Sequence, residues 1–257
     1  MAIDSWNAID AAQRKFPVFC CAFLDMLGYK EKSARFFANE YNLPGRIQRA
    51  TTTISTAMTI TTALVDTTGI SVEIFSDSIV ILKPVGGGGI ASVFFFAQVF
   101  VANLGLEGLF VRGGISIGKH SDEMTETGFR VLTSEALQKA YLLESKMART
   151  PRILIDPELI TGLQPDERRM VAKDGDEPML HYANFVVNRR GDNLDDVYAE
   201  MCEIQNTKDH TDDPDIRVKL QWLLDYYHWT IGLIGGTVSE RFNRFVSAAR
   251  PAFGLLE

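Results

Sequence analysis

The chain has 257 residues, of which 46% are hydrophobic and 23% are charged, an ordinary composition for a soluble globular protein of one domain with additions. Its formal net charge of −7 argues against a general nucleic-acid-binding protein, and its three cysteines cannot form a full disulfide framework. The polar, acid-containing start is unlike a signal peptide, and no run reaches the roughly 18 apolar residues that a membrane span needs. We therefore expect a cytoplasmic protein with free thiols and with no DNA, RNA or membrane partner.

Residues 1–160 are predicted to form one α+β domain. Apolar runs bounded by turn residues predict strands at 17–25, 70–75, 78–83, 109–117 and "PRILID". Helical patterns are found at 30–42, 46–65, 90–104 and 133–148. The polar stretch "GKHSDEMTETG" is interpreted as a loop or a hairpin arm. This order of elements predicts a ferredoxin-like, mostly antiparallel sheet with helices on one face.

The pattern changes from about residue 160. The stretch "LQPDERRMVAKDGDEP" is polar and is predicted to be a loop, whereas 194–206 and 214–232 are predicted to be helices. Asp213 could cap the second of these helices, with Pro214 at its first position. We expect residues 161–257 to form an extension with a helical hairpin packed on the first domain.

Two predicted strands each carry one aspartate among apolar residues, Asp25 in "CAFLDMLGY" and Asp77 in "IFSDSIVIL". In a ferredoxin-like sheet these strands are neighbours, so the two carboxylates could converge at one edge. Close, half-buried carboxylates repel each other and lose hydration, and a divalent cation removes both costs. Oxygen ligands favour Mg²⁺ or Mn²⁺ over zinc, and two such ions are the apparatus of phosphoryl and nucleotidyl transfer. The alternative is that Asp25 caps the next helix and Asp77 forms a hairpin turn.

The residues that follow Asp25 could bind phosphate. The sequence from Met26 through Leu27, Gly28 and Tyr29 turns directly into a predicted helix, whose first amides favour anions. Gly28 would let this backbone come close to a ligand, and the Met26 carbonyl is expected to complete one metal shell. Arg112 is expected to bind phosphate or to pair with an acidic side chain.

Two other signals are set aside. "GGISIGKH" imitates a phosphate-binding P-loop, but His120 stands where serine or threonine should hold magnesium. The four histidines show no ligand spacing, so no zinc site is expected. The aromatic run "WLLDYYHW" around Trp222 and Tyr227 is interpreted as core or dimer packing.

Four segments resemble the class III nucleotidyl cyclases, over roughly residues 16–156: "FLDMLGY", "EIFSDSIVI", "FVRGGISIGK" and "SEALQKAYLLES". The resemblance implies a cyclase catalytic domain whose Asp25 and Asp77 hold two Mg²⁺ or Mn²⁺ ions. It also implies a nucleoside triphosphate substrate and a homodimer with active sites between the subunits, in which the metal aspartates of one subunit meet base-reading and transition-state residues of the other.

The departures from the family concern catalysis and base recognition. Gln138 stands in place of the family's transition-state asparagine and Leu142 in place of its arginine, and leucine cannot stabilise charge on phosphate. We expect Lys139 to act with Gln138, with other nearby cations as alternatives: Lys146, Arg149 and Arg152. The two base-reading positions hold Glu73 and Val131, a pair that matches neither adenine nor guanine readers because valine has no donor or acceptor.

Within the family, "FSDS", "RGGI" and "AYLLE" followed by "PRILID" look like the bacterial stand-alone pyrimidine cyclases of Pycsar anti-phage defence. This resemblance implies cyclic UMP from UTP, or cyclic CMP from CTP second, as a messenger linked to its effector only through the cyclic nucleotide. The expected substrate-binding residues are Leu27, Gly28, Tyr29, Glu73, Arg112 and Val131. Alternatives are a degenerate cyclase fold that binds a nucleotide or a protein, a purine cyclase, and another two-metal nucleotidyl transferase, for which no Gly-Gly-Asp/Glu-Glu-Phe signature is found.

Overall fold

The computed structural model describes residues 16–61, 68–189, 194–233, 240–245 and 252–256. The strands are β1 (Val18–Met26), β2 (Ser71–Phe75), β3 (Ser78–Pro84), β4 (Val111–Met124), β5 (Arg130–Ser134), β6 (Ile153–Ile155), β7 (Val171–Asp174), β8 (Glu177–Leu180) and β9 (Phe253–Leu255). The helices are α2 (Tyr29–Phe37), α3 (Leu43–Thr61), α4 (Gly89–Leu106), α5 (Glu135–Lys146), α6 (Pro157–Ile160), α7 (Pro165–Arg168), α8 (Tyr182–Arg189), α9 (Asp195–Asp209), α10 (Pro214–Leu233) and α11 (Glu240–Asn243).

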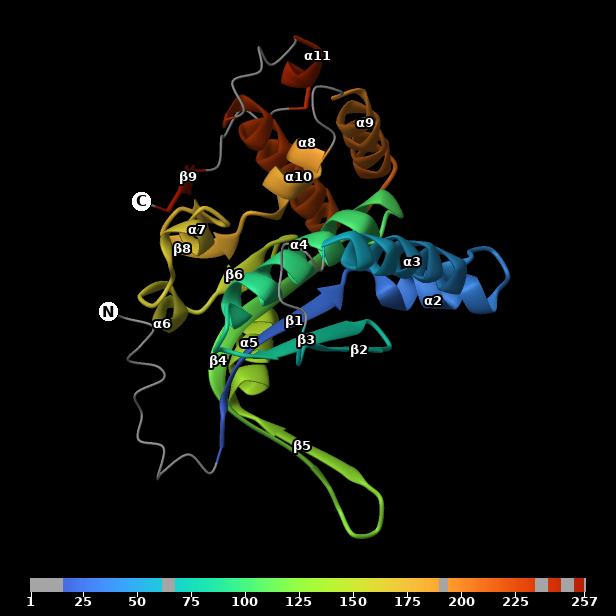
Figure 1. The fold of residues 1–257 in the computed structure, drawn as a ribbon. Helices are drawn as coiled ribbons and strands as arrows, with labels where there is room; N and C mark the ends of the chain where they lie inside the picture. Colours follow the sequence, from blue (N-terminus) through green and yellow to red (C-terminus); the bar gives the residue numbers. More distant parts are fainter. Residues whose placement is uncertain (1–15, 62–67, 190–193, 234–239, 246–251, 257) are drawn as a thin grey trace.

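In the described residues the strands form one nine-stranded sheet of order β2-β3-β1-β4-β6-β8-β7-β9, with β5 paired to β4 (Figure 1). All pairs are antiparallel except β4 with β6. The order of β2, β3, β1 and β4 is the one expected of a ferredoxin-like sheet. The predicted α+β class, with a mostly antiparallel sheet and flanking helices, is therefore confirmed.

Strand β1 is buried on both of its faces. Cys20, Ala22 and Leu24 point into the larger core, which includes α4, whereas Cys21 and Phe23 belong to a second core that α5 completes. The expectation that helices cover only one face is wrong, because a continuous apolar run needs cover on both sides of the sheet.

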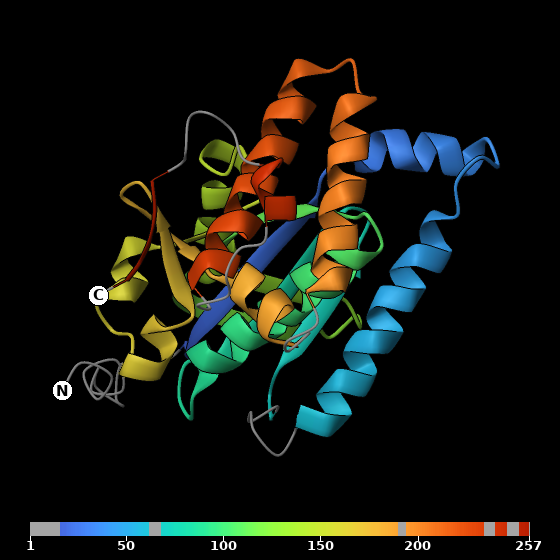
Figure 2. The ribbon, with the colours of Figure 1, turned by 90° about the horizontal axis from the view of Figure 1, so that it is seen from above.

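Helix α4 lies between the sheet and the C-terminal helices (Figures 1 and 2). Among the described residues it is the one helix long and apolar enough to cross a membrane, and 83% of it is buried inside the fold. A helix that is apolar all round and enclosed by other elements fits the interior of a domain.

The sheet continues beyond residue 160. The predicted loop at 163–178 is wrong in both halves. The first half contains helix α7, and in the second half β7 and β8 form a hairpin whose turn contains Gly175, at φ 62°. An Asp-Gly pair between short apolar segments is a hairpin signal, and these strands are only four residues long, which hides their alternation. Strand β9 adds to the same sheet, so residue 160 is not a break in it.

The helical hairpin predicted in the extension is present. Helices α9 and α10 lie side by side (Figure 2), and the Asp213 carboxylate accepts the amide of Asp215 at 2.8 Å, at the start of α10. The aromatic run on α10 is buried within the subunit, where Trp222 stacks on Tyr226 at 5.2 Å and meets Phe253 of β9. The prediction that Trp222 and Tyr227 offer a dimer surface is therefore wrong.

Gly114 tests how closely α5 packs on β4. A Cβ at this position would lie 2.3 Å from the Ala140 carbonyl oxygen and 2.7 Å from Leu143 Cβ, both on α5. Gly114→Ala should therefore lower the free energy of unfolding by about 1–3 kcal/mol, as expected when a tight core is overfilled. Urea denaturation followed by circular dichroism measures this loss.

The matched control is Gly86→Ala, because a Cβ at that exposed turn position meets nothing within 4 Å. It should change stability by no more than about 0.5 kcal/mol. Equal losses for the two variants would show that α5 does not press on the β4 backbone.

Candidate functional site

Asp25 and Asp77 lie at neighbouring strand ends. Asp25 is opposite Ser78 in the β1–β3 register, and the Met26 amide donates to the Asp77 carbonyl at 2.8 Å. Asp77 belongs to the two-residue turn between β2 and β3, where Ser76 adopts φ 56°. The structure thus brings together two segments that are far apart in sequence, at the sheet edge where their meeting was expected.

Asp25 shares its surroundings with a third carboxylate. Alternation along β1 puts Asp25 on the face covered by α5, and Glu144 of α5 lies there with a side chain only 4% exposed. Arg112, opposite Asp25 on β4, places its Nε 3.2 Å from Asp25 Oδ2 and 2.7 Å from Glu144 Oε1. We call Asp25, Asp77, Glu144 and Arg112 the carboxylate cluster.

One guanidinium does not balance the three carboxylates. Burial raises the pKa of Asp25, an effect that Arg112 opposes and Asp77 reinforces. Burial likewise raises the pKa of Glu144, with Arg112 opposing it and both aspartates adding to it. A bound cation would neutralise the surplus negative charge of this half-buried cluster and so stabilise it.

The donor set fits a cation that takes its remaining ligands from a substrate. No group of three or more His, Cys, Asp or Glu side chains among the described residues is close enough to hold a metal by itself. Arg112 holds Oδ2 of Asp25, and Oδ1 accepts no hydrogen bond from a residue that the structure describes. Mg²⁺ is commonly held by one or two carboxylates together with phosphate and water oxygens. Asp25 and Asp77 would therefore hold the ion, with the Met26 carbonyl as the further predicted ligand.

The loop after Asp25 differs in one respect from the phosphate-binding loop that was expected. Gly28 has φ 68°, a conformation suited to glycine, and α2 begins directly after it. The Leu27 amide, however, donates to the Phe110 carbonyl at 2.8 Å, so it is not available to phosphate. Gly28 and Tyr29 stand at the start of the helix, and their binding of phosphate stays a prediction.

The two predicted base-reading positions are linked by an arginine that sequence reasoning missed. Arg130 of β5 pairs with Glu73 of β2 and, at 2.7 Å, with Asp122 of β4. Hydrogen bonds to these two carboxylates raise the pKa of Arg130. Val131 follows it on β5 and is about half exposed. A charged residue directly before a base-reading position was the available signal.

Gln138 and Lys139 lie away from the carboxylate cluster of their own subunit. Gln138 precedes Glu144 by six residues and Lys139 precedes it by five, which is about 9 Å and about 7.5 Å along the helix axis. Lys139 pairs with Glu158 of α6 at 2.9 Å, a hydrogen bond that raises the pKa of Lys139. Gln138 lines a separate hollow of about 440 Å³ at the base of the β4–β5 hairpin, together with Val131.

From the sequence, we also expect the helix that carries Gln138 and Lys139 to lie two strands from Asp25, and this expectation is wrong. Helix α5 packs over β1 and β4, and the Tyr141 ring meets Phe23 edge to face at 5.4 Å. Among the alternative cations, Arg152 pairs with Asp174 at 3.0 Å and Glu177 at 2.7 Å, which gives it a structural role.

Glu144 is the functional candidate that sequence reasoning missed. Ala136, Ala140 and Glu144 recur at four-residue spacing and are the buried residues of α5. A carboxylate on an otherwise apolar helix face was the available signal.

No protein-family model and no curated protein matches this chain. Three similar solved structures are the catalytic core of a rhodopsin-guanylyl cyclase with converted specificity in complex with ATPalphaS, the guanylate cyclase domain of RhGC from Catenaria anguillulae in complex with GTP, and the monomeric guanylyl cyclase domain of the RhoGC fusion protein from the aquatic fungus Blastocladiella emersonii. Their TM-scores are 0.42, 0.40 and 0.43, each at 12% identity and over 64% of this chain, and the match covers 92%, 93% and 95% of the respective structures. TM-scores below 0.5 do not assign a family, so a function has to be inferred from this chain's own residues.

The raised pKa of Glu144 predicts a pH-dependent difference between wild type and Glu144→Gln. Between the ordinary carboxyl range and the raised value, the folded state binds more protons than the unfolded state, so wild-type stability falls as pH rises. Glutamine does not titrate, so the melting temperature of the variant relative to wild type should rise as the pH increases above the ordinary carboxyl range, from about pH 4 upward. Differential scanning calorimetry across this range measures the change.

Glu126→Gln is the control, since Glu126 is exposed in the turn between β4 and β5. Its difference from wild type should stay nearly constant over the same pH range. A Glu144→Gln difference that is flat, or that falls as pH rises, would contradict the electrostatic description of the carboxylate cluster.

Proposed function

We propose that the chain is a nucleotide cyclase that converts a nucleoside triphosphate into its 3′,5′-cyclic monophosphate and pyrophosphate. The observation that carries this proposal is the adjacency of Asp25 and Asp77 at the ends of β1 and β3. They stand in a ferredoxin-like strand order and within the two cyclase-like motifs "FLDMLGY" and "EIFSDSIVI".

In the proposed reaction, the substrate 3′-oxygen bonds to the α-phosphorus in line, the bond from that phosphorus to the pyrophosphate oxygen breaks, and the hydroxyl proton leaves to water. Two divalent cations, when bound, would supply Lewis-acid activation of the 3′-oxygen and charge stabilisation on the phosphates. The carboxylate oxygens of Asp25 and Asp77 would bind these cations. Arg112 fixes the Asp25 carboxylate through Oδ2, and the Gly28 turn presents the start of α2 to the phosphates.

We further propose a pyrimidine substrate, UTP before CTP. Val131 offers a base no donor or acceptor, and Glu73 is engaged by Arg130, so neither known purine-reading pair is available. A cytoplasmic second-messenger role in anti-phage defence follows from the same subfamily resemblance. A purine cyclase is compatible with the same fold.

A catalytically inactive nucleotide-binding protein is the second candidate. Two observations favour it: Arg112 occupies one oxygen of Asp25, and Leu142 stands where a cyclase needs a cation. Incubation with each of the four ribonucleoside triphosphates and Mn²⁺, analysed by mass spectrometry, separates the two. Cyclic UMP is the expected main product. Binding without turnover would support the inactive protein, faster turnover of ATP or GTP would overturn the pyrimidine assignment, and a linear or dinucleotide product would overturn the cyclase.

Asp25→Asn and Asp77→Asn should each keep the fold and lower turnover by at least about 100-fold, or about 2.7 kcal/mol, because an amide binds a divalent cation poorly. Initial rates with saturating Mn²⁺ measure the effect. Asp166→Asn is the control, since that side chain is 90% exposed on α7, and it should retain wild-type turnover. Near-normal activity of either metal-site variant would refute the two-metal proposal.

We propose a homodimer in which α5 of one subunit serves the site of the other. Exposed apolar side chains support an interface on this face: Phe129 (72%) and Met124 (68%) on the projecting β4–β5 hairpin (Figure 1), and Tyr141 and Leu142 on α5. A two-fold axis would give two equivalent sites, each combining Asp25 and Asp77 with Gln138 and Lys139 of the partner.

Mixed dimers test this arrangement. Asp25→Asn should inactivate the metal half of a site, and the double change Gln138→Ala with Lys139→Ala the opposing half. Co-purified heterodimers should recover up to about half of wild-type activity, since one of their two sites is intact. An inactive heterodimer, or a fully active monomer measured by analytical ultracentrifugation and turnover, would contradict the shared site.

A further inference from the structure

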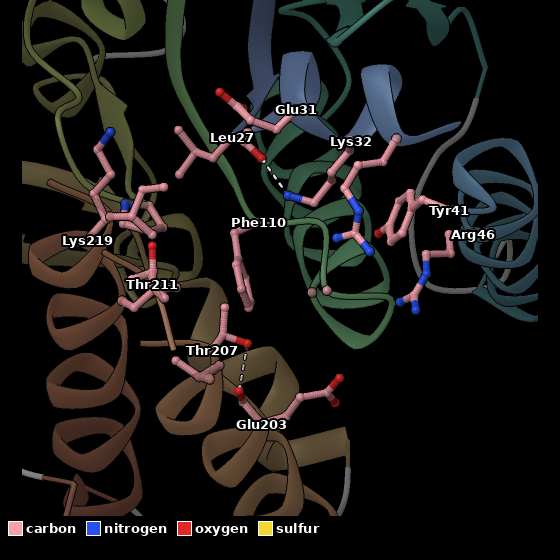
Figure 3. Close-up of a pocket in the computed structure, with 18 of the residues that line it drawn as sticks. Leu27, Glu31, Lys32, Tyr41, Arg46, Phe110, Glu203, Thr207, Thr211 and Lys219 are labelled. Carbon is pink, nitrogen blue, oxygen red and sulfur yellow. Dashed lines mark hydrogen bonds between the residues drawn. The ribbon is translucent and has the colours of Figure 1, made fainter. Parts of the chain in front are cut away.

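A cavity of about 660 Å³ lies between the start of α2 and α3 on one side and the α9–α10 hairpin on the other (Figure 3). It adjoins the carboxylate cluster only through Leu27 and Gly28, which follow Asp25 on the chain. Its volume is in the range of small-molecule sites. One of its walls belongs to the C-terminal extension, for which the proposed reaction gives no role.

Three cations line the wall formed by α2 and α3. These are Lys32, Arg35 and Arg46, and the guanidinium carbons of the two arginines lie 5.4 Å and 5.0 Å from the centre of the Tyr41 ring. The Lys32 ammonium donates to the Leu27 carbonyl at 3.1 Å, and Arg46 donates to the Glu107 carbonyl at 2.6 Å. Both contacts are with carbonyl groups, which carry no net charge, and the acidic side chains that line this wall are Glu31 and Glu40.

No carboxylate of the described part of the chain forms an ion pair with any of these three cations. Burial lowers the pKa of Lys32, and Arg35 and Arg46 add to this while Glu31 opposes it. Crowded cations in a half-buried wall cost free energy unless an anion neutralises them. Arginine forks are suited to a phosphate.

The rest of the cavity is less polar and carries acids. Phe110 projects into its middle, and Thr207 and Thr211 face it from the side of α9 and α10 (Figure 3). Glu200 and Glu203 of α9 also line it, the former accepting a hydrogen bond from Tyr227 at 3.0 Å. A chain of several phosphates would meet these glutamates, whereas one phosphate on the basic wall, with an uncharged ring toward Phe110, would not.

We propose that this cavity binds a small molecule with a single phosphate and a planar ring, of the nucleoside monophosphate class. The phosphate lies on Lys32, Arg35 and Arg46, the ring lies against Phe110, and hydroxyl groups of the ligand face Thr207 and Glu203. Because Lys32 also holds the Leu27 carbonyl, the occupant contacts the segment that directly follows Asp25. The cavity shares Leu27 and Gly28 with the proposed cyclase site, but none of its three cations has a role in the proposed reaction.

Isothermal titration of the full chain with UMP and AMP tests the proposal, with EDTA present to suppress metal-dependent binding at Asp25 and Asp77. At least one nucleotide should bind with a Kd below about 1 mM, and at least about 10-fold more tightly than its nucleoside or inorganic phosphate alone. Arg35→Gln should weaken this binding at least 10-fold. The Arg35 side chain lies over the Tyr41 ring and forms no ion pair among the described residues, so the fold should persist. Lys32→Met provides a second variant should Arg35→Gln unfold.

Arg169→Gln is the matched control, since Arg169 is an 81% exposed arginine directly after α7 and outside the cavity. The affinity of this variant should equal that of wild type. The proposal would be overturned by a lack of nucleotide binding below about 1 mM, by equal binding of nucleoside and nucleotide, or by unchanged binding in a folded Arg35→Gln variant. Equal binding of inorganic phosphate and nucleotide would remove the ring from the assignment and therefore also overturn it.

Discussion

The guanidinium of Arg112 connects the three elements that form the candidate site. It lies on β4, pairs with Asp25 at the end of β1, and reaches Glu144 on α5. Without this cation, the carboxylates at this edge of the sheet would be buried with no opposite charge beside them, which is strongly unfavourable. With it, they remain under-compensated, since burial still raises the pKa of both Asp25 and Glu144. An imbalance of this kind in a folded protein is characteristic of sites that bind a cation or transfer protons.

The position of α5 depends on two glycines of β4, which have no side chain to keep the helix away. At Gly114 and Gly118 the helix backbone comes so near that a Cβ would lie 2.3 Å and 2.7 Å from helix atoms. This close approach brings Glu144 to the carboxylate cluster and leaves Gln138 nearer the β4–β5 hairpin. The same geometry therefore separates the two sets of residues that a cyclase must combine, which is why a second subunit enters the proposal.

Much of the fold was predictable because its signals are local. Apolar runs identified β1, β3 and the start of β4, helical spacing identified α5 and α10, and Asp213 with Pro214 marked the start of α10. The β7–β8 hairpin was missed because four-residue strands carry too few residues for alternation to be seen. The covering of both sheet faces was also missed, although the unbroken apolar character of β1 required it.

The sequence by itself determined the main strands and helices of the first domain, the ferredoxin-like order of β2, β3, β1 and β4, and the two aspartates of the candidate site, since each has a signal in the kind and spacing of its residues. Only the tertiary structure decided the partners. Glu144 meets Arg112, Glu73 meets Arg130, and Arg35 and Arg46 lie over the Tyr41 ring in the cavity that α9 also lines. The sequence around each of these side chains gives no sign of its partner. Such contacts depend on how whole elements pack, and packing is set by the shape of all side chains together, which the pattern in any one segment does not contain.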